Sequence, residues 1–281
     1  MLVCDVATGF AGCKISFRAM LYRETMRYVY VERERHMRVA QNVYAVLDMF
    51  HPICGVNAGF VVTEKHIVYV DSGWTIPSAQ TLLGYSLAVA PNNKPKYLIF
   101  TDHHPDHISG MKAIKEAGVK TIGHANLDLW LRENKIEGWR DFVTSLYTRW
   151  FSELYSKDES LRELLFGDVE LSPLDQTIDR DTVFKVDGEE IHVLDTPGHW
   201  KACLSVYLPS SKVLFAGDAI FSGFEPATRF GDKNLWQQWI ISLERLSKLD
   251  VSVIIPGHGR LCDTKEIPRH ITYLEELIAK T

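Results

Sequence analysis

Short apolar runs recur along the chain from about residue 42, and polar turns or amphipathic stretches separate them. Runs of this length between turn residues are typical of buried or half-buried strands. In the first half of the chain they lie at 43–49, 59–63, 67–70, 97–100 and 120–122. In the second half they lie at 182–186, 190–194, 203–208, 213–215 and 251–255. Apolar residues at helical spacing predict helices at 77–88, 111–116, 235–249 and 268–279.

This order of elements predicts two similar βα halves, with a sheet-on-sheet core and helices on the outer faces. Two stretches depart from it. Residues 1–41 show no clear periodicity, and we predict an N-terminal extension that packs on a core domain of residues 42–281. Residues 126–167 carry apolar side chains three and four residues apart, which predicts a helical cap. Helix packing is the first explanation of the aromatic residues there, and contact with a substrate is the alternative.

The composition narrows the class of protein. The 281 residues are 46% hydrophobic and 24% charged with a net charge of −5, so a basic surface for nucleic acid is not expected. No apolar run approaches the roughly 20 residues of a membrane-spanning helix, and no signal peptide is expected. The five cysteines are scattered without a CxxC pair, as in proteins with reduced thiols. We therefore expect a cytoplasmic protein with a small-molecule substrate and no nucleic-acid or membrane partner; a homodimer stays open.

The candidate chemistry is concentrated in residues 102–107, where three histidines and two aspartates follow the predicted strand at 97–100. Alternate side chains of an extended segment share a face, so Asp102 and His104 point one way and His103 points the other. Nitrogen and oxygen donors at this density are typical of a site for a divalent metal ion.

Further donors follow along the chain. Pro105 is expected to keep the loop from continuing as a helix, and the turn after it lets Asp106 and His107 face the same pocket. Three more donors follow apolar runs and tight turns that contain glycine, which lets the backbone approach a metal closely. They are His199 after Pro197-Gly198, Asp218 after Gly217, and His258 after Pro256-Gly257.

Together these motifs resemble the metallo-β-lactamase superfamily of binuclear metallohydrolases, from about residue 42 to about residue 262. The resemblance rests on Asp71-Ser72-Gly73, the cluster at 102–107 and the three downstream turns, all in the family's order. It implies an α/β fold, the four-layer αβ/βα sandwich, here with a helical insert. It also implies two sets of metal ligands and a bridge between them: Asp102, His104 and His199 for the first ion, Asp106, His107 and His258 for the second, and Asp218 for both.

Asp102 is the one departure, because the usual pattern has a histidine there. A carboxylate is a harder ligand, which shifts the preference of the first site toward iron or manganese. His103 could substitute by its position, but it points the wrong way along the strand. We expect two divalent metal ions as cofactors, zinc first, with iron or manganese as alternatives.

In the mechanism that the resemblance implies, a hydroxide bridging the two ions attacks a carbonyl carbon or a phosphorus atom. Asp106 as proton acceptor and Asp218 as bridging ligand are the predicted catalytic residues. Asp71 and Asp195 are candidates to orient ligand histidines through the ring nitrogen that does not bind metal.

The expected substrate is a small ester, lactone or phosphoester. Lactonases of the family often carry a tyrosine three residues after the bridging aspartate, and Phe221 stands there. Phe221 and Trp200 are expected to line an apolar pocket. Two alternatives stay open: an iron-dependent oxidoreductase similar to the persulfide dioxygenases, and a thioesterase similar to glyoxalase II. The complete second set of ligands favours hydrolysis.

Overall fold

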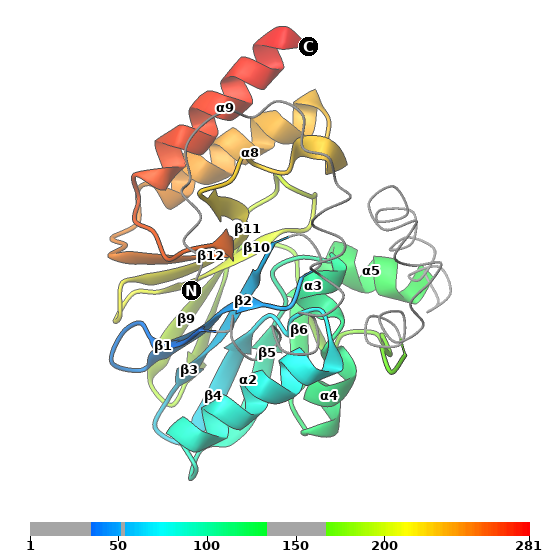
Figure 1. Cartoon of the computed structure of the whole chain (residues 1–281), viewed down its shortest axis with the longest axis vertical. Coiled ribbons are helices and arrows are strands. Elements are labelled where there is room, and N and C mark those ends of the chain that lie inside the picture. The colour runs from blue at the N-terminus through cyan, green and yellow to red at the C-terminus, as the bar shows by residue number, and fades with distance from the viewer. Residues whose placement is uncertain (1–34, 52–53, 134–166) are drawn as a thin grey trace, which may run out of the picture. The chain divides into compact units, whose positions relative to one another are not determined.

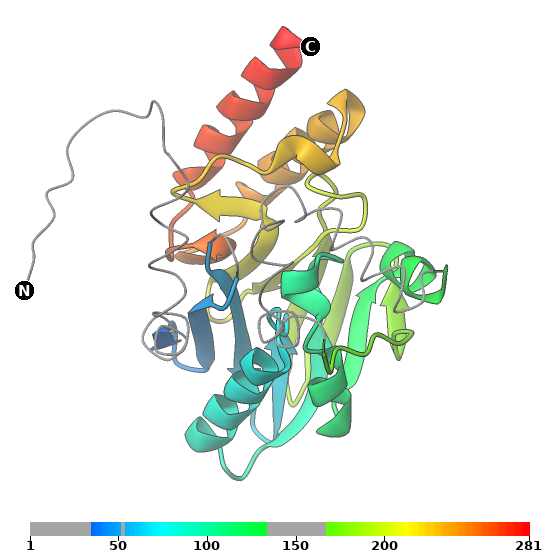
Figure 2. The same ribbon diagram turned by 45° about the vertical axis from the view of Figure 1, so that its right-hand side comes forward.

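The computed structural model describes residues 35–51, 54–133 and 167–281, and Figures 1 and 2 show it from two sides. The strands of its first half are β1 (Arg35–Arg38), β2 (Val43–Met49), β3 (Val56–Val62), β4 (His66–Val70), β5 (Lys94–Ile99), β6 (Lys120–His124) and β7 (Gln176–Ile178). Those of the second half are β8 (Thr182–Val186), β9 (Glu189–Asp195), β10 (Leu204–Leu208), β11 (Val213–Ser222) and β12 (Val253–Gly259). Their order is β7-β6-β5-β4-β3-β12-β11-β10-β9-β8, and β2 pairs with both β3 and β1.

The two halves meet at one antiparallel pair, His258 of β12 opposite Val56 of β3. In the first half β4, β5, β6 and β7 run parallel to one another. In the second half β8, β9, β10 and β11 form antiparallel pairs, and β12 runs parallel to β11. The junction between the halves therefore falls beside a predicted metal ligand.

The helices lie on the outer faces of the two halves. They are α2 (Ile76–Val89), α3 (Pro105–Ile108), α4 (Met111–Glu116), α5 (Ala125–Glu133), the short η1 (Thr228–Phe230), α8 (Lys233–Leu246) and α9 (Glu266–Lys280). In Figure 1, α2 and α4 cover the strands of the first half, and α8 and α9 cover those of the second. None of the described helices is long and apolar enough to cross a membrane.

Alternate residues of each strand pack into different hydrophobic clusters, and this creates the layers. Ile67 and Tyr69 of β4 pack with helical residues such as Leu82. Val68 and Val70 of the same strand pack between the two halves. A third cluster joins β11 and β12 to α8 and α9. Three clusters separate four layers, helix, sheet, sheet and helix, so the predicted αβ/βα sandwich is confirmed.

Three local predictions were wrong. Pro105 begins a helix instead of preventing one, because it occupies the first turn of α3, where a missing N–H costs little. The strand predicted at 213–215 continues to Ser222, since the register of β11 against β12 shifts around Gly217, whose φ is 53°. Asp218 consequently lies inside β11, and His258 lies inside β12, where it pairs with Phe221; turns had been expected at both positions.

The predicted extension and cap are only partly described. Of residues 1–41 the structure describes 35–41, and Arg35–Arg38 form the exposed strand β1 along β2. Of the predicted cap at 126–167 it describes α5 up to Glu133 and Gly167; residues 134–166 lie outside the described residues. The division into extension, core and cap stays a prediction.

Candidate metal centre

The first four predicted donors are positioned by the end of β5 and the start of α3. Asp102 follows β5, and His104 is the extended residue that precedes α3, with φ −65° and ψ 152°. Pro105 then sets the helical φ, so that Asp106 and His107 lie in the first turn of the helix. A strand end, one extended residue and a proline thus bring all four side chains into a short segment.

The other three donors come from the second half. His199 lies in the turn between β9 and β10, Asp218 in β11 and His258 in β12. A Cβ on Gly198 would lie 2.3 Å from Cγ of Trp239, so only glycine lets the His199 turn pack this closely on α8. All seven predicted ligands are buried, each with at most 4% of its surface exposed.

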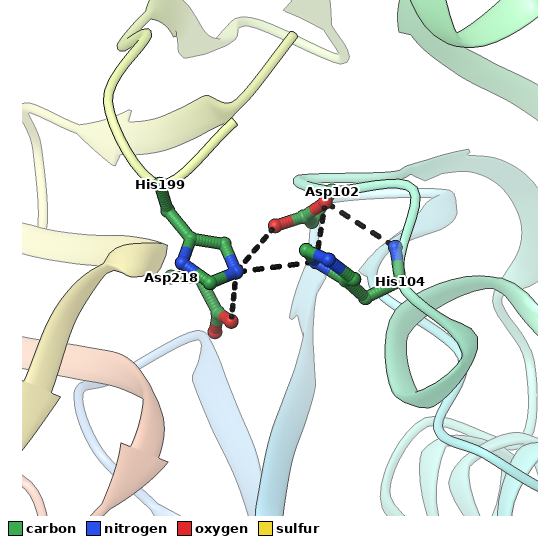
Figure 3. A group of neighbouring side chains, drawn as sticks. All are labelled: Asp102, His104, His199 and Asp218. Carbon is green, nitrogen blue, oxygen red and sulfur yellow. Dashed lines mark hydrogen bonds and ion pairs between the residues drawn. The ribbon is translucent and has the colours of Figure 1, made fainter. Parts of the chain in front are cut away.

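The first group of donors surrounds Nε2 of His199 (Figure 3). This atom lies 3.1 Å from Nδ1 of His104, 3.3 Å from Oδ2 of Asp218 and 3.6 Å from Oδ2 of Asp102. We call these four residues the first cluster. One ligand atom from each lies within 4.8 Å of the others, which fits a single metal ion.

Asp106, His107 and His258 form the second cluster. Oδ2 of Asp106 lies 3.2 Å from Nε2 of His258 and 3.7 Å from Nε2 of His107. Asp218 faces this cluster with its other oxygen, because Oδ1 lies 3.3 Å from Nε2 of His107 and 3.5 Å from Nε2 of His258. One carboxylate therefore presents an oxygen to each cluster, which is the geometry of a bridging ligand.

Two buried atoms test whether the donors suit metal ions. Within the part of the chain that the structure describes, Nε2 of His107 and Oδ1 of Asp218 make no hydrogen bond and face one another at 3.3 Å. Buried polar atoms are rarely left in this state, since desolvation without a partner is costly. A cation between the two atoms would satisfy both. The two buried His/Asp clusters fit a binuclear metal site.

Asp71 orients His107, as predicted. Oδ2 of Asp71 accepts a hydrogen bond from Nδ1 of His107 at 2.9 Å and another from Oγ1 of Thr101 at 2.6 Å. Nε2 of His107 is thereby left to face the cluster. The corresponding prediction for Asp195 was wrong, because its carboxylate lies 3.7 Å from His124, which belongs to neither cluster.

Backbone carbonyls orient two more of the histidines. Nδ1 of His199 donates to the carbonyl oxygen of Ala227 at 2.9 Å, and Nδ1 of His258 donates to that of Gly55 at 2.7 Å. Each ring is thereby fixed in the tautomer that leaves Nε2 as the ligand atom. Sequence patterns cannot locate such partners, since any residue has a carbonyl.

Metal binding is expected to release protons from the second cluster. Burial lowers the pKa of His107, but the surrounding carboxylates, Asp71 first, outweigh this and raise it well above its usual value. Burial also lowers the pKa of His258, but Asp218 and Cys54 raise it well above its usual value. Both rings therefore carry a proton at neutral pH in the metal-free protein, and a metal ligand must be neutral.

We expect about two protons to be released per protein loaded with zinc at pH 7, so that affinity rises with pH until both rings are neutral. Calorimetric zinc titrations in two buffers with different ionisation enthalpies would measure this number. His199 adds none, because burial lowers its pKa to about 4. A binding enthalpy that does not depend on the buffer would contradict the prediction.

Two residues beside the second cluster were not predicted from the sequence. Nε2 of His51 lies 3.6 Å from Oδ2 of Asp106, and its Nδ1 accepts the N–H of Cys54 at 3.0 Å, so the hydrogen on the ring points toward Asp106. Sγ of Cys54 lies 3.4 Å from Nδ1 of His258. Burial raises the pKa of this thiol, but His258 and His51 lower it to about 6. One feature of the sequence could have predicted His51: it follows the strand at 43–49, as the other donors follow predicted strands.

Aromatic rings surround the ligand histidines. Phe230 of η1 lies 4.3 Å, centroid to centroid, from His104 and 5.2 Å from His199. Phe221 stacks on His258 at 5.3 Å and is itself buried, so it packs behind a ligand. The expected apolar surroundings are present, but Phe221 supports the site instead of offering an open wall.

The layered fold and the paired clusters define a class of metal-binding α/β proteins, and comparison with known proteins gives the family. The profile described as "Metallo-beta-lactamase superfamily" matches residues 51–258, and the chain belongs to this superfamily. The structure of the DIM-1 metallo-beta-lactamase shares the fold with a TM-score of 0.66 and 20% identity, over 87% of this chain and 98% of that one.

Two relatives show how varied the similar proteins are. "Beta-lactamase-like protein 2 homolog" of Caenorhabditis elegans is 24% identical over 221 residues, 79% of this chain and 61% of the relative. A hydroxyacylglutathione hydrolase of Bartonella tribocorum is 37% identical over 90 residues, 30% of this chain and 33% of the relative. The chain thus spans less than two thirds of either relative. The second of these relatives is a hydrolase by its name.

Proposed function

We propose that this protein is a binuclear metallohydrolase that cleaves a small, partly apolar ester, lactone or phosphoester. The observation that carries the proposal is Asp218, whose two oxygens lie 3.3 Å from a histidine of each cluster. Two divalent ions held by these residues would supply Lewis-acid polarisation of a substrate oxygen and activation of water. Zinc is the first candidate for both ions, with iron or manganese as alternatives.

The residues around the ions have separate tasks. Asp106 is the proposed proton acceptor for the attacking water: burial raises its pKa, but the facing histidines, His107 first, hold it below the usual range, so it is ionised at neutral pH. His51 directs a ring hydrogen at the same carboxylate. The half-buried Phe230, against His104 and His199, supports a substrate with an apolar part beside the first cluster.

A thioester is the second candidate substrate. It is supported by the identity of 37% over 90 residues to a hydroxyacylglutathione hydrolase. Thioester and ester hydrolysis need the same attack on a carbonyl carbon, so the two clusters serve either reaction.

Elemental analysis followed by a substrate panel tests the proposal. The panel is p-nitrophenyl acetate, a γ-lactone, an acyl-glutathione thioester and a phosphotriester. We expect two metal ions per chain and hydrolysis of at least one compound. His192→Ala is a suitable control, because His192 lies on β9 and pairs with the exposed Glu190, away from both clusters. A single iron with oxygen consumption on glutathione persulfide would instead support the oxidoreductase alternative and refute the hydrolase.

A further inference from the structure

One oxygen of Asp102 is enclosed by hydrogen-bond donors. Oδ1 accepts the backbone N–H of His103 in a short contact, the backbone N–H of His104 at 3.2 Å, and Nδ1 of His103 at 2.7 Å. An ionised carboxylate can only accept, so Nδ1 of His103 must carry the hydrogen. Three donors on one oxygen use most of its lone-pair capacity and fix the plane of the carboxylate.

The other oxygen faces the first cluster. Oδ2 of Asp102 lies 3.6 Å from Nε2 of His199, and the thiol of Cys203 donates to it at 3.5 Å. The backbone and His103 therefore engage Oδ1, which also lies 3.1 Å from Nδ1 of His104, and Oδ2 is the oxygen that faces His199 in the first cluster.

The ring of His103 is itself held firmly. It stacks on Trp200 with centroids 3.6 Å apart and planes 22° apart, and the edge of Trp130 approaches it at 5.6 Å. Only 4% of its surface is exposed. Such packing leaves the Nδ1–H group little freedom to leave Asp102.

We propose that His103 is a positioning residue, which holds Asp102 as a one-oxygen ligand and thereby sets the affinity of the first cluster for its metal ion. This inference rests on the proposed binuclear centre and concerns one ligand of it. A free carboxylate can rotate and bind through one or both oxygens, whereas the imidazole usual at this position has a single ligand atom. By engaging Oδ1, the His103 side chain limits Asp102 to one ligand oxygen, so that the aspartate resembles an imidazole in offering a single ligand atom.

The test measures zinc affinity, which does not depend on turnover. Purified protein is stripped of metal and titrated with zinc against a chromophoric chelator, which resolves a tight and a weak site. His103→Phe keeps a ring to stack on Trp200 but removes the Nδ1–H donor. His103→Asn keeps a side-chain N–H donor of similar reach but removes the ring. Thermal unfolding of the metal-free proteins checks that each variant folds.

We expect His103→Phe to weaken one zinc site about 10- to 100-fold and to leave the other within about threefold of the wild type. His103→Asn should restore most of the lost affinity. In an Asp102→His background His103→Phe should change the affinity little, because the carboxylate that it positions is gone.

Unchanged affinity in His103→Phe would overturn the inference, and so would an equal loss in the Phe and Asn variants. An effect that persists in the Asp102→His background would show that His103 acts through packing alone. A wild-type protein that binds fewer than two ions would refute the proposed binuclear centre, and this inference with it. Two ions bound by both the wild type and His103→Phe with equal affinity would refute only the role of His103.

Discussion

Replacing Asp218 with asparagine is expected to reduce the rate of hydrolysis about 10³-fold or more. Two bridged metal ions lower the activation free energy by several kcal/mol, and each 1.4 kcal/mol is a factor of ten in rate. The amide has almost the same shape, but it offers one ligand oxygen where both Oδ1 and Oδ2 are needed. It also removes one of the three carboxylates that offset the charge of two ions. We expect metal content to fall from two ions to one or none.

Activity and metal content, measured on the same preparations, check this prediction. Asp250→Asn is the matched control, because Asp250 is exposed and pairs only with Lys212 among the described charged groups. It should keep both activity and metal. Two bound ions together with activity within about threefold of the wild type would contradict the bridging role of Asp218.

Replacing Gly257 with alanine is expected to disrupt the same carboxylate without changing any ligand. A Cβ on Gly257 would lie 2.0 Å from Oδ1 of Asp218 and 2.8 Å from the carbonyl carbon of Gly217. Both contacts are impossible, and the second is to backbone, so β11 and β12 must separate or Asp218 must turn away. We expect loss of metal from the second cluster and a decrease of about 1–3 kcal/mol in the free energy of unfolding.

Gly84→Ala is the control for this second prediction. Gly84 lies inside α2, and a Cβ there would meet no atom within 4 Å. Alanine favours a helix over glycine by about 1 kcal/mol, so this variant should be as stable as the wild type or slightly more stable. Thermal unfolding and metal analysis separate the two variants. If Gly257→Ala kept both ions and its stability, the close approach of the two strands would not matter for the site.

Periodicity and motif order predicted the fold and the seven converging donors, because both depend on local patterns. The αβ/βα sandwich follows from alternating apolar positions such as Ile67 and Val68, which supply different clusters. Asp102 was predicted as a ligand from the family resemblance, with strand alternation in support, and it lies in the first cluster.

What local patterns missed depends on tertiary contacts. Asp195 stands at the end of a strand, a position from which Asp71 orients a ligand histidine, but its carboxylate contacts His124, which is not a ligand. His51 and Cys54 reach the second cluster through contacts with residues 55 and 204 positions further along the chain, Asp106 and His258. No periodicity encodes such a distance. The register shift at Gly217, which places Asp218 inside β11, likewise requires β12 beside it.

Among the described residues the backbone links the two halves at few points, such as the pair His258 opposite Val56 and the hydrogen bond from Leu204 N–H to the carbonyl oxygen of Thr101. In the proposed metal-loaded protein, both halves would also be cross-linked through the ions, since Asp102 and His107 come from one half and His199 and Asp218 from the other. Occupancy would then add to folding stability as well as to reactivity, by about 4 kcal/mol at a thousandfold excess of free metal over its dissociation constant. Metal supply would therefore control how much of this protein survives in the folded state, independently of any substrate.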